Sequence, residues 1–236
     1  PVSNAGQFIA TVTDDIDGNL RNTSTPDIGA DEYTFVVGPL TGIKYIPGDY
    51  ASIPLAIADL NTLGVGTGGV TFKVAAGHVD TAANLIINTT GTSTKPIVFE
   101  KSGTGANPVV VAAPGTGTLD GIIILNGVDN ITFNGIDLME NSLNTNDTTR
   151  MEWGYALLKV DGTNGSQENT IKNCNITLNK ANVNSKGIYS ANHTTASSTS
   201  LTVTAFSGTN SENMINGNTV KNCYIGIYVA GFADAT

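Results

Sequence analysis

Three stretches of this chain read alike: NITFNGIDL at residues 130–138, TIKNCNITL at 170–178 and TVKNCYIGI at 219–227. They align without gaps, and their first apolar residues, Ile131, Ile171 and Val220, are spaced by about 40 and then 49 positions. A sequence that repeats at such a period predicts a stack of similar structural units. We therefore expect each repeat to be one coil of chain that lies on the previous coil at the strand spacing of ~4.8 Å.

Stacked coils place equivalent side chains in columns. The gapless alignment predicts two inward columns and one column at a bend: Ile131/Ile171/Val220, Ile136/Ile176/Ile225 and Asn134/Cys174/Cys223. Stacked parallel side chains keep their Cβ atoms about as far apart as their Cα atoms, whereas a disulfide needs Cβ atoms about 3.8 Å apart. The two cysteines are therefore predicted to be buried free thiols.

The other apolar runs after residue 69 fit the same scheme. From Val70 to Val229, short runs of Val, Ile, Leu and Phe alternate with turns. The chain contains 32 Thr, 27 Gly and 26 Asn, residue types that favour strands and tight turns. This pattern predicts an all-β protein whose parallel strands form stacked coils over about residues 70–229.

One helix is expected before the strands begin. Ile53, Ala56, Ile57, Leu60 and Leu63 recur at helical spacing. A capping residue, Asp49 or Ser52, precedes the run, and a proline at position 54 is tolerated in a first turn. An open end of a stack exposes unpaired backbone groups, so a helix over residues 51–63 is expected to cap the first coil with Ile53, Ile57 and Leu60 facing inward.

The chain divides into three parts by composition. Residues 1–37 hold apolar runs at 7–12 and 33–37 around acidic turns, and we interpret them as a short β segment that closes a preceding module. Residues 38–50 begin with the sequence GPLTG, which is typical of a turn, and are expected to be a connector. Residues 51–236 are expected to be the cap and first coils of a second module, so that the chain is a piece of a longer protein.

Composition and charge exclude several classes of protein. The chain has 11 Lys and Arg against 20 Asp and Glu, a net charge of −9, and no basic run, so a nucleic-acid partner is not expected. No apolar stretch reaches the ~20 residues of a membrane span, so no membrane span is expected, and no export signal is expected within residues 1–236.

Several segments resemble a known family. The stretches YASIPLAIADLN at 50–61, GGVTF at 68–72 and NTVKNC at 218–223 resemble the start of right-handed parallel β-helix (pectin-lyase-like) repeat domains in large secreted and cell-surface, adhesin-like proteins of Bacteroidota. The stretches DIDGNLR at 15–21 and DIGADEY at 27–33 are similar to the closing segment of such domains. The resemblance implies a right-handed parallel β-helix, an extracellular or cell-surface location and export by the type IX system.

A calcium site is the first candidate for chemistry. Asp15, Asp17 and Asn19 provide oxygen ligands in one acidic turn, as a calcium loop does. Gly18, however, comes earlier than the glycine of an EF-hand. The alternative, which we favour, is a turn held by backbone bonds and a contact of Arg21, with no cofactor.

The sequence assigns no catalytic residue. A polysaccharide lyase needs a carboxylate cluster with a basic residue, and a glycosidase needs two flanking carboxylates. The chain has only two arginines, Arg21 and Arg150, and its aspartates are scattered. His78 and His193 have no other metal ligands at a suitable spacing, so a zinc site is not expected.

The loop 141–152 is the best candidate for ligand recognition. Arg150, Trp153 and Tyr155 lie in it or directly after it, and Trp is a strong platform for stacking on sugar rings. The alternative is that Trp153 and Tyr155 pin the loop to the coil below.

Together, these observations predict a non-catalytic structural or adhesive segment of a large extracellular repeat protein. Its partners would be an extracellular polysaccharide or surface glycan and neighbouring modules of the same chain. The alternative is a β-helix polysaccharide lyase or glycoside hydrolase whose active face lies mostly outside residues 1–236.

Overall fold

The computed structural model describes residues 6–16, 20–26, 28 and 38–232, and these fall into two compact units, Pro1–Gly38 and Pro39–Thr236. The boundary lies one residue beyond the predicted end of the first part, residue 37. Each unit is described separately below.

The described part of the first unit consists of turns. Asp14 and Leu20 form an isolated antiparallel bridge, and the N–H of Arg21 donates to the carbonyl of Thr13 at 2.8 Å. Residues 7–12 do not form the predicted strand; they include a turn closed by a bond from the N–H of Val12 to the carbonyl of Ile9. The other predicted run, residues 33–37, lies outside the described residues.

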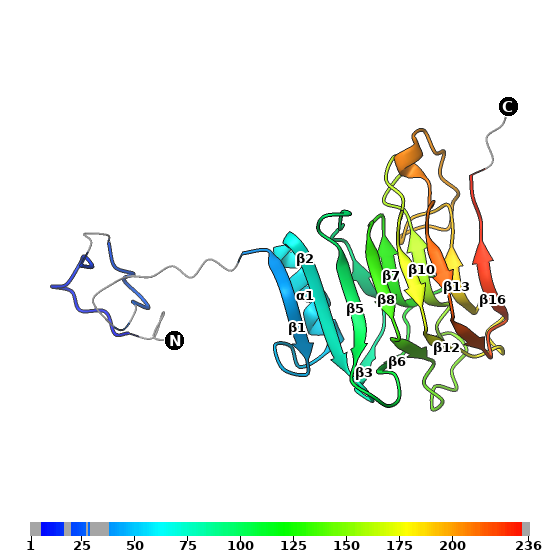
Figure 1. The fold of residues 1–236 in the computed structure, drawn as a ribbon, viewed down its shortest axis with the longest axis horizontal. Coiled ribbons are helices and arrows are strands. Elements are labelled where there is room, and N and C mark those ends of the chain that lie inside the picture. The colour runs from blue at the N-terminus through cyan, green and yellow to red at the C-terminus, as the bar shows by residue number, and fades with distance from the viewer. Residues whose placement is uncertain (1–5, 17–19, 27, 29–37, 233–236) are drawn as a thin grey trace. The chain divides into compact units, whose positions relative to one another are not determined.

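The second unit contains three parallel β-sheets (Figure 1). Sheet I has the order β1-β2-β5-β8-β11-β14, formed by Leu40–Ile46, Val65–Ala75, Ile97–Ser102, Ile131–Asn134, Thr170–Lys172 and Met214–Asn216. Sheet II has the order β3-β6-β9-β12-β15, formed by Val79–Ala82, Val109–Ala112, Asp137–Met139, Asn175–Thr177 and Thr219–Lys221. Sheet III has the order β4-β7-β10-β13-β16, formed by Leu85–Ile87, Gly121–Asn126, Trp153–Leu158, Lys186–Ser190 and Ile225–Val229.

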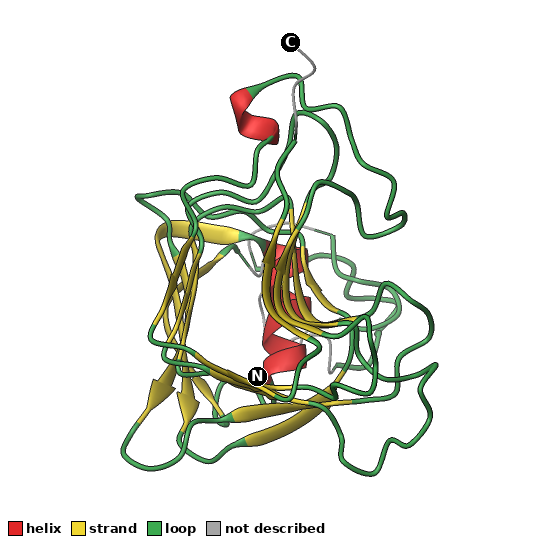
Figure 2. Cartoon of the chain, turned by 90° about the vertical axis from the view of Figure 1, so that its right-hand side faces the viewer, coloured by secondary structure: helices red, strands yellow, loops and turns green. Residues whose placement is uncertain are grey.

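The chain visits the three sheets in turn. After β1, each pass adds one strand to sheet I, one to sheet II and one to sheet III, and we call each pass a coil. Five coils follow one another, from β2–β4 to β14–β16. Seen along the stack, the three sheets surround a common interior (Figure 2). The parallel all-β prediction is confirmed for this unit.

The register differs from the predicted one. Ile171 pairs with Phe133 and Ile215, not with Ile131 and Val220. Val220 lies in the second strand of its coil, opposite Ile176. The true inward columns are therefore Phe133/Ile171/Ile215 and Leu138/Ile176/Val220. The prediction was wrong because β11 and β15 carry similar residues, so sequence likeness alone matched strands of two different sheets.

Aromatic rings fill the interior behind sheet I. Phe72, Phe99 and Phe133 lie in one register column, and their ring centroids are 4.4 Å and 5.1 Å apart with nearly parallel planes. The Tyr155 ring, which comes from β10 of sheet III, lies against Phe133 at 5.1 Å with its plane tilted by 50°. All four side chains are fully buried. Stacked rings bury a large apolar area and gain additional energy from their mutual geometry.

The helix α1, Ile53–Leu63, caps the first coil as predicted. Its buried residues are Ile53, Ala56, Ile57 and Leu60, and the helix contacts the strands β1 to β4. The Ser52 hydroxyl accepts the N–H of Leu55 at 3.4 Å. The buried carboxylate of Asp80, on β3, accepts the N–H of Ile53 at 2.8 Å, which ties the helix N-terminus to the coil.

The predicted connector is mostly a strand. Residues Leu40–Ile46 form β1, which pairs in parallel with β2 and extends sheet I by one strand. Leu40 and Ile46 are buried. The glycines and prolines at positions 38, 39, 42 and 47 suggested a linker, but β1 is the outermost strand of sheet I at this end of the stack, where such residues are tolerated.

Asparagine amides link successive coils. Asn169 accepts the N–H of Ile131 at 3.0 Å and donates to the carbonyl of Val128 at 2.8 Å. Asn213 repeats the contact one coil later, where it accepts the N–H of Asn169 at 2.9 Å. These bonds satisfy backbone groups at bends, where ladder hydrogen bonds are interrupted. They account for part of the high asparagine content.

Both cysteines are free, as predicted, but for another reason. Cys174 is buried at the bend before β12, where its N–H donates to the side chain of Asn218 at 3.0 Å. Cys223 is half-buried and follows β15. Because Asn218, not Cys223, lies next to Cys174 in the following coil, the expected cysteine column does not exist.

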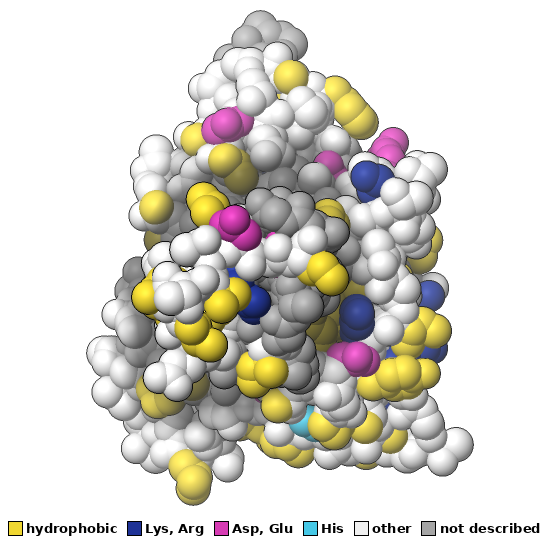
Figure 3. Space-filling model, turned by 90° about the vertical axis from the view of Figure 1, so that its left-hand side faces the viewer, with side chains coloured by type: hydrophobic (Ala, Val, Ile, Leu, Met, Phe, Trp, Pro, Cys, Tyr) yellow, Lys and Arg dark blue, Asp and Glu magenta, His cyan; other side chains and the backbone are white. Residues whose placement is uncertain are grey.

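The fifth coil is more exposed than the fourth. Ile171 and Ile176 in the fourth coil are at most 1% exposed, whereas their partners Ile215 and Val220 in the fifth coil are half-buried. Ile227, on β16, is 50% exposed. Figure 3 shows few charged side chains among neutral ones, as the 13% of charged residues in the sequence implies. Among the described residues, no helix is long and apolar enough to cross a membrane.

Candidate functional site

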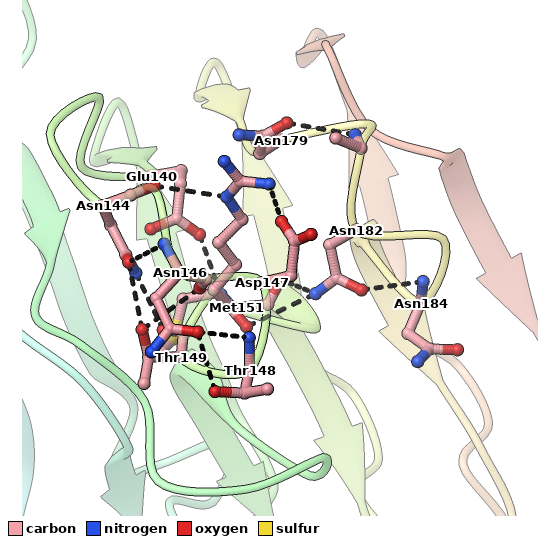
Figure 4. A network of polar contacts seen from close by, with 12 residues as sticks. Glu140, Asn144, Asn146, Asp147, Thr148, Thr149, Met151, Asn179, Asn182 and Asn184 are labelled. Atoms are coloured by element: carbon pink, nitrogen blue, oxygen red, sulfur yellow. Dashed lines mark hydrogen bonds and ion pairs between the residues drawn. The ribbon is translucent and has the colours of Figure 1, made fainter.

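A network of polar contacts holds the loop before β10 (Figure 4). Arg150 takes part in two of these contacts. The guanidinium contacts the carboxylate of Asp147 through Nη1, and its Nε donates to the carbonyl of Asn144 at 3.2 Å. The Asn144 amide in turn donates to the carbonyl of Thr149 at 2.9 Å. The Arg150 side chain therefore bonds within its own loop, and only 12% of it is exposed.

Glu140 anchors the base of this loop. Its two oxygens accept the N–H groups of Met151 at 2.8 Å and Asn141 at 3.1 Å. Burial raises the pKa of this carboxyl above its ordinary value, and the two backbone donors oppose that shift only in part. The loop 141–150 is thus closed by one buried side chain at both of its ends.

The next coil supplies a second loop, residues 179–185. The Asn182 amide donates to the carbonyl of Met151 at 3.2 Å and to the Glu152 carboxylate at 3.1 Å, and its oxygen accepts the N–H of Asn184 at 3.0 Å. Glu152 also accepts the N–H of Asp120 at 3.3 Å. Burial raises the pKa of Glu152, and the neighbouring charge of Asp120 adds to the effect.

The previous coil supplies a turn, residues 116–120. The Asp120 carboxylate accepts the N–H groups of Thr116 at 2.5 Å and Gly117 at 2.6 Å, and it also accepts the amide of Asn84 at 2.8 Å. These bonds hold the turn in one conformation, with Thr116, Gly117 and Thr118 exposed at its tip.

Two grooves flank this tip. The polar groove, of ≈ 390 Å³, is lined by Thr116, Gly117, Thr118, Asp147, Thr148, Thr149, Glu152, Asn182 and Asn184. The apolar groove, of ≈ 480 Å³, is lined by Asn84, Ile86, Gly117, Thr118, Leu119, Asp120, Ile124, Thr195 and Ala196. The two grooves share Gly117 and Thr118 and therefore meet at this tip.

Trp153 and Tyr155 do not line either groove, which corrects the prediction that they present a stacking platform. Trp153 is 2% exposed, and its ring stacks on Tyr189 at 4.7 Å. Tyr155 is fully buried, and its hydroxyl donates to the carbonyl of Ile136 at 2.8 Å. Both rings point into packed regions because β10 is covered on both of its faces, so the alternative, a structural pin, describes them better.

A second cluster lies around Trp153. Tyr189 donates its hydroxyl to Nε2 of His193 at 2.8 Å, and Nδ1 of His193 lies 2.7 Å from the carbonyl of Thr194. The carbonyl fixes the proton on Nδ1, which leaves Nε2 as the acceptor. This cluster holds the segment that begins at residue 191 against the outer face of sheet III.

The predicted calcium ligands lie mostly outside the described residues. Asp17 and Asn19 are not among them, whereas Asp15 is described. The described residues contain no group of three or more His, Cys, Asp or Glu side chains that could hold a metal ion. A calcium ion at this turn remains a prediction, as does the side-chain contact of Arg21.

The groove residues 116–118, 182 and 184 were not singled out from the sequence. The signal for them is the strand register, which only the structure gives: Asp120, Glu152 and Ser185 each directly precede a strand of sheet III, at equivalent positions in successive coils. The turns before these strands must therefore stack. Searches against protein-family models, curated proteins and solved structures found no match.

Proposed function

We propose that the second unit is a right-handed parallel β-helix that serves as a non-catalytic structural and adhesive segment of a large extracellular or cell-surface repeat protein. The observation that carries the proposal is the stack itself, in which every coil adds one strand to each of three sheets. Such a stack gives a long, stiff body from a repetitive sequence, which suits a spacer that holds binding surfaces away from a cell.

The ends of the stack support a place within a longer assembly. One end is covered by α1, whereas the other end presents β14, β15 and β16 with half-buried Ile215 and Val220. Open strand edges with apolar side chains are normally covered. A further coil of a parallel β-helix, as in a neighbouring module of the same chain, would continue all three sheets and both apolar columns.

The adhesive part of the proposal rests on the two grooves. Their lining side chains are hydroxyls, amides, aliphatic groups and the carboxylates of Asp120, Asp147 and Glu152, and they come from the first four coils. Loops on a rigid scaffold are common places for recognition. An extracellular polysaccharide or surface glycan fits this chemistry because sugars offer many hydroxyl groups.

The carboxylates near the grooves favour binding over catalysis. Asp120 and Glu152 are both buried, and each accepts hydrogen bonds that hold a loop. Among the described residues that line the polar groove, none is a lysine or arginine that could act as the base of a lyase. The alternative, a polysaccharide lyase or glycoside hydrolase, would place its active face in other coils.

One experiment separates the two functions. The chain is incubated with neutral and acidic polysaccharides, and both retention in an affinity gel and release of reducing or unsaturated ends are measured. Retention without release supports the adhesive proposal. Release of new chain ends would refute it in favour of an enzyme, and an absence of retention on every polysaccharide and on whole cells would refute the adhesive role.

A further inference from the structure

The polar groove has the size and the chemistry of a small ligand site. Its volume of ≈ 390 Å³ falls within the range of ligand pockets. Its walls carry four threonine hydroxyls and the exposed amide of Asn184, whereas the buried Asn182 amide is already bonded within the protein. Hydroxyls and amides can both donate and accept hydrogen bonds, which matches a ligand whose own groups do the same.

The charges around the groove select against ionic ligands. Asp147 contacts Arg150, so its charge is already compensated. The Glu152 oxygens are occupied by the Asn182 amide and by the N–H of Asp120. An anionic ligand would meet these carboxylates with no free basic side chain among the described lining residues, in a chain whose net charge is −9. Electrostatics therefore favours a neutral ligand over an anionic one.

The apolar groove adds a second requirement. Ile86 and Leu119, both half-buried, offer aliphatic surface next to the tip formed by Gly117 and Thr118, whereas Ile124 lies buried beneath them. A ligand that occupies both grooves must present polar groups on one part and C–H groups on another. A chain of pyranose rings does so, because its hydroxyls lie at the ring edges and its C–H bonds on the ring faces.

We propose that the polar groove, together with the apolar groove, binds a neutral, hydroxyl-rich oligosaccharide. This inference rests on the proposed adhesive function and names its site and its ligand class. Threonine and asparagine side chains hold the hydroxyl edges of one sugar unit in the polar groove. The next unit crosses the tip of the turn and places a ring face on the aliphatic side chains.

The structure offers a blocking variant with a matched control. A Cβ atom added to Gly117 would have no atom within 4 Å, so Gly117→Trp is compatible with the fold and places an indole between the grooves. Gly231 has equally open surroundings and lines neither groove. Gly231→Trp therefore adds the same side chain elsewhere on the chain.

A second pair of variants removes single hydrogen-bonding groups. Asn184 is exposed in the polar groove, and its hydrogen bonds run through its backbone: its N–H donates to the Asn182 side chain, and its carbonyl accepts from Nζ of Lys186. Asn184→Ala thus removes an amide from the groove without removing a contact that holds the loop. Asn164→Ala, at an exposed asparagine outside both grooves, is the control.

The experiment is a titration of the whole chain with hexasaccharides of glucose, mannose and xylose, and with hexagalacturonate as the anionic comparison. We expect a neutral hexasaccharide to bind, Gly117→Trp to weaken binding at least 10-fold, and Asn184→Ala to weaken it about 2- to 10-fold. Both control variants should bind as the parent chain does, and the melting temperature of each variant verifies its fold.

Three results would overturn the inference. Tighter binding of hexagalacturonate would show that the ligand class is wrong. Neutral binding that survives Gly117→Trp would place the site elsewhere and leave the adhesive function standing. If no hexasaccharide binds but a polysaccharide or whole cells still retain the chain, the groove is not the site. If neither the hexasaccharides nor any polysaccharide nor cells bind the chain, the proposed adhesive function is refuted.

Discussion

Replacing Phe99 by leucine tests the aromatic column that joins the first coils. The Phe99 ring is fully buried and stacks on Phe72 at 4.4 Å and on Phe133 at 5.1 Å. Each such pair contributes about 0.5–1.5 kcal/mol beyond the area that it buries. Because leucine stays apolar but loses both ring pairs, we expect Phe99→Leu to lower the free energy of unfolding by about 1–3 kcal/mol. Phe99→Ala adds a cavity, and the cost should rise to about 3–5 kcal/mol.

The assay is urea unfolding followed by circular dichroism and by the fluorescence of Trp153, the one tryptophan of the chain. The control is Phe206→Leu, because Phe206 is 67% exposed, and it should change stability by less than about 0.5 kcal/mol. If Phe99→Leu and Phe206→Leu destabilise the chain equally, the rings do not form a packed column and the register described above is wrong.

Three further predictions follow from local geometry. Gly154→Ala should destabilise the chain by about 1–3 kcal/mol in thermal unfolding, because the new Cβ would lie 2.5 Å from the carbonyl oxygen of Gly187; an unchanged melting temperature would contradict the close approach of these strands. Burial raises the pKa of Glu152, so its stabilising contribution is present below the ordinary glutamate pKa and is lost as pH rises through the folded-state value. Melting temperatures between about pH 4 and pH 7 should therefore fall less steeply for Glu152→Gln than for the parent chain, and parallel curves would argue against the shift. In a thiol titration, half-buried Cys223 should react in the folded chain and buried Cys174 only after denaturation; two equally fast thiols would contradict these positions.

The helix and the strand class were predictable because their signals are local. The apolar spacing of Ile53, Ile57 and Leu60 and the capping residue Ser52 define an amphipathic helix whatever surrounds it. The short runs of Val and Ile separated by Asn and Gly define strands and bends in the same way. Burial of the helix face on the first coil then followed from the need to cover an open sheet end.

The register was not predictable from likeness alone. The segments around Ile171 and Val220 are similar in sequence, yet they lie in sheets I and II of different coils. Insertions between residues 191 and 214 change the length of one coil, so a constant spacing cannot reveal which strand pairs with which. Only the pairing of Ile171 with Phe133 and Ile215 in space resolves it.

The candidate site shows the same division. By itself, the sequence determined an all-β, acidic chain with a repeating strand pattern, one amphipathic helix and a polar loop at 141–152, because composition and periodicity are properties of neighbouring residues. The tertiary structure alone decided that Trp153 is buried and that Gly117 and Asn184 border one groove. These residues are brought together by the stacking of three coils, and a distance across coils depends on loop lengths and register rather than on any local pattern.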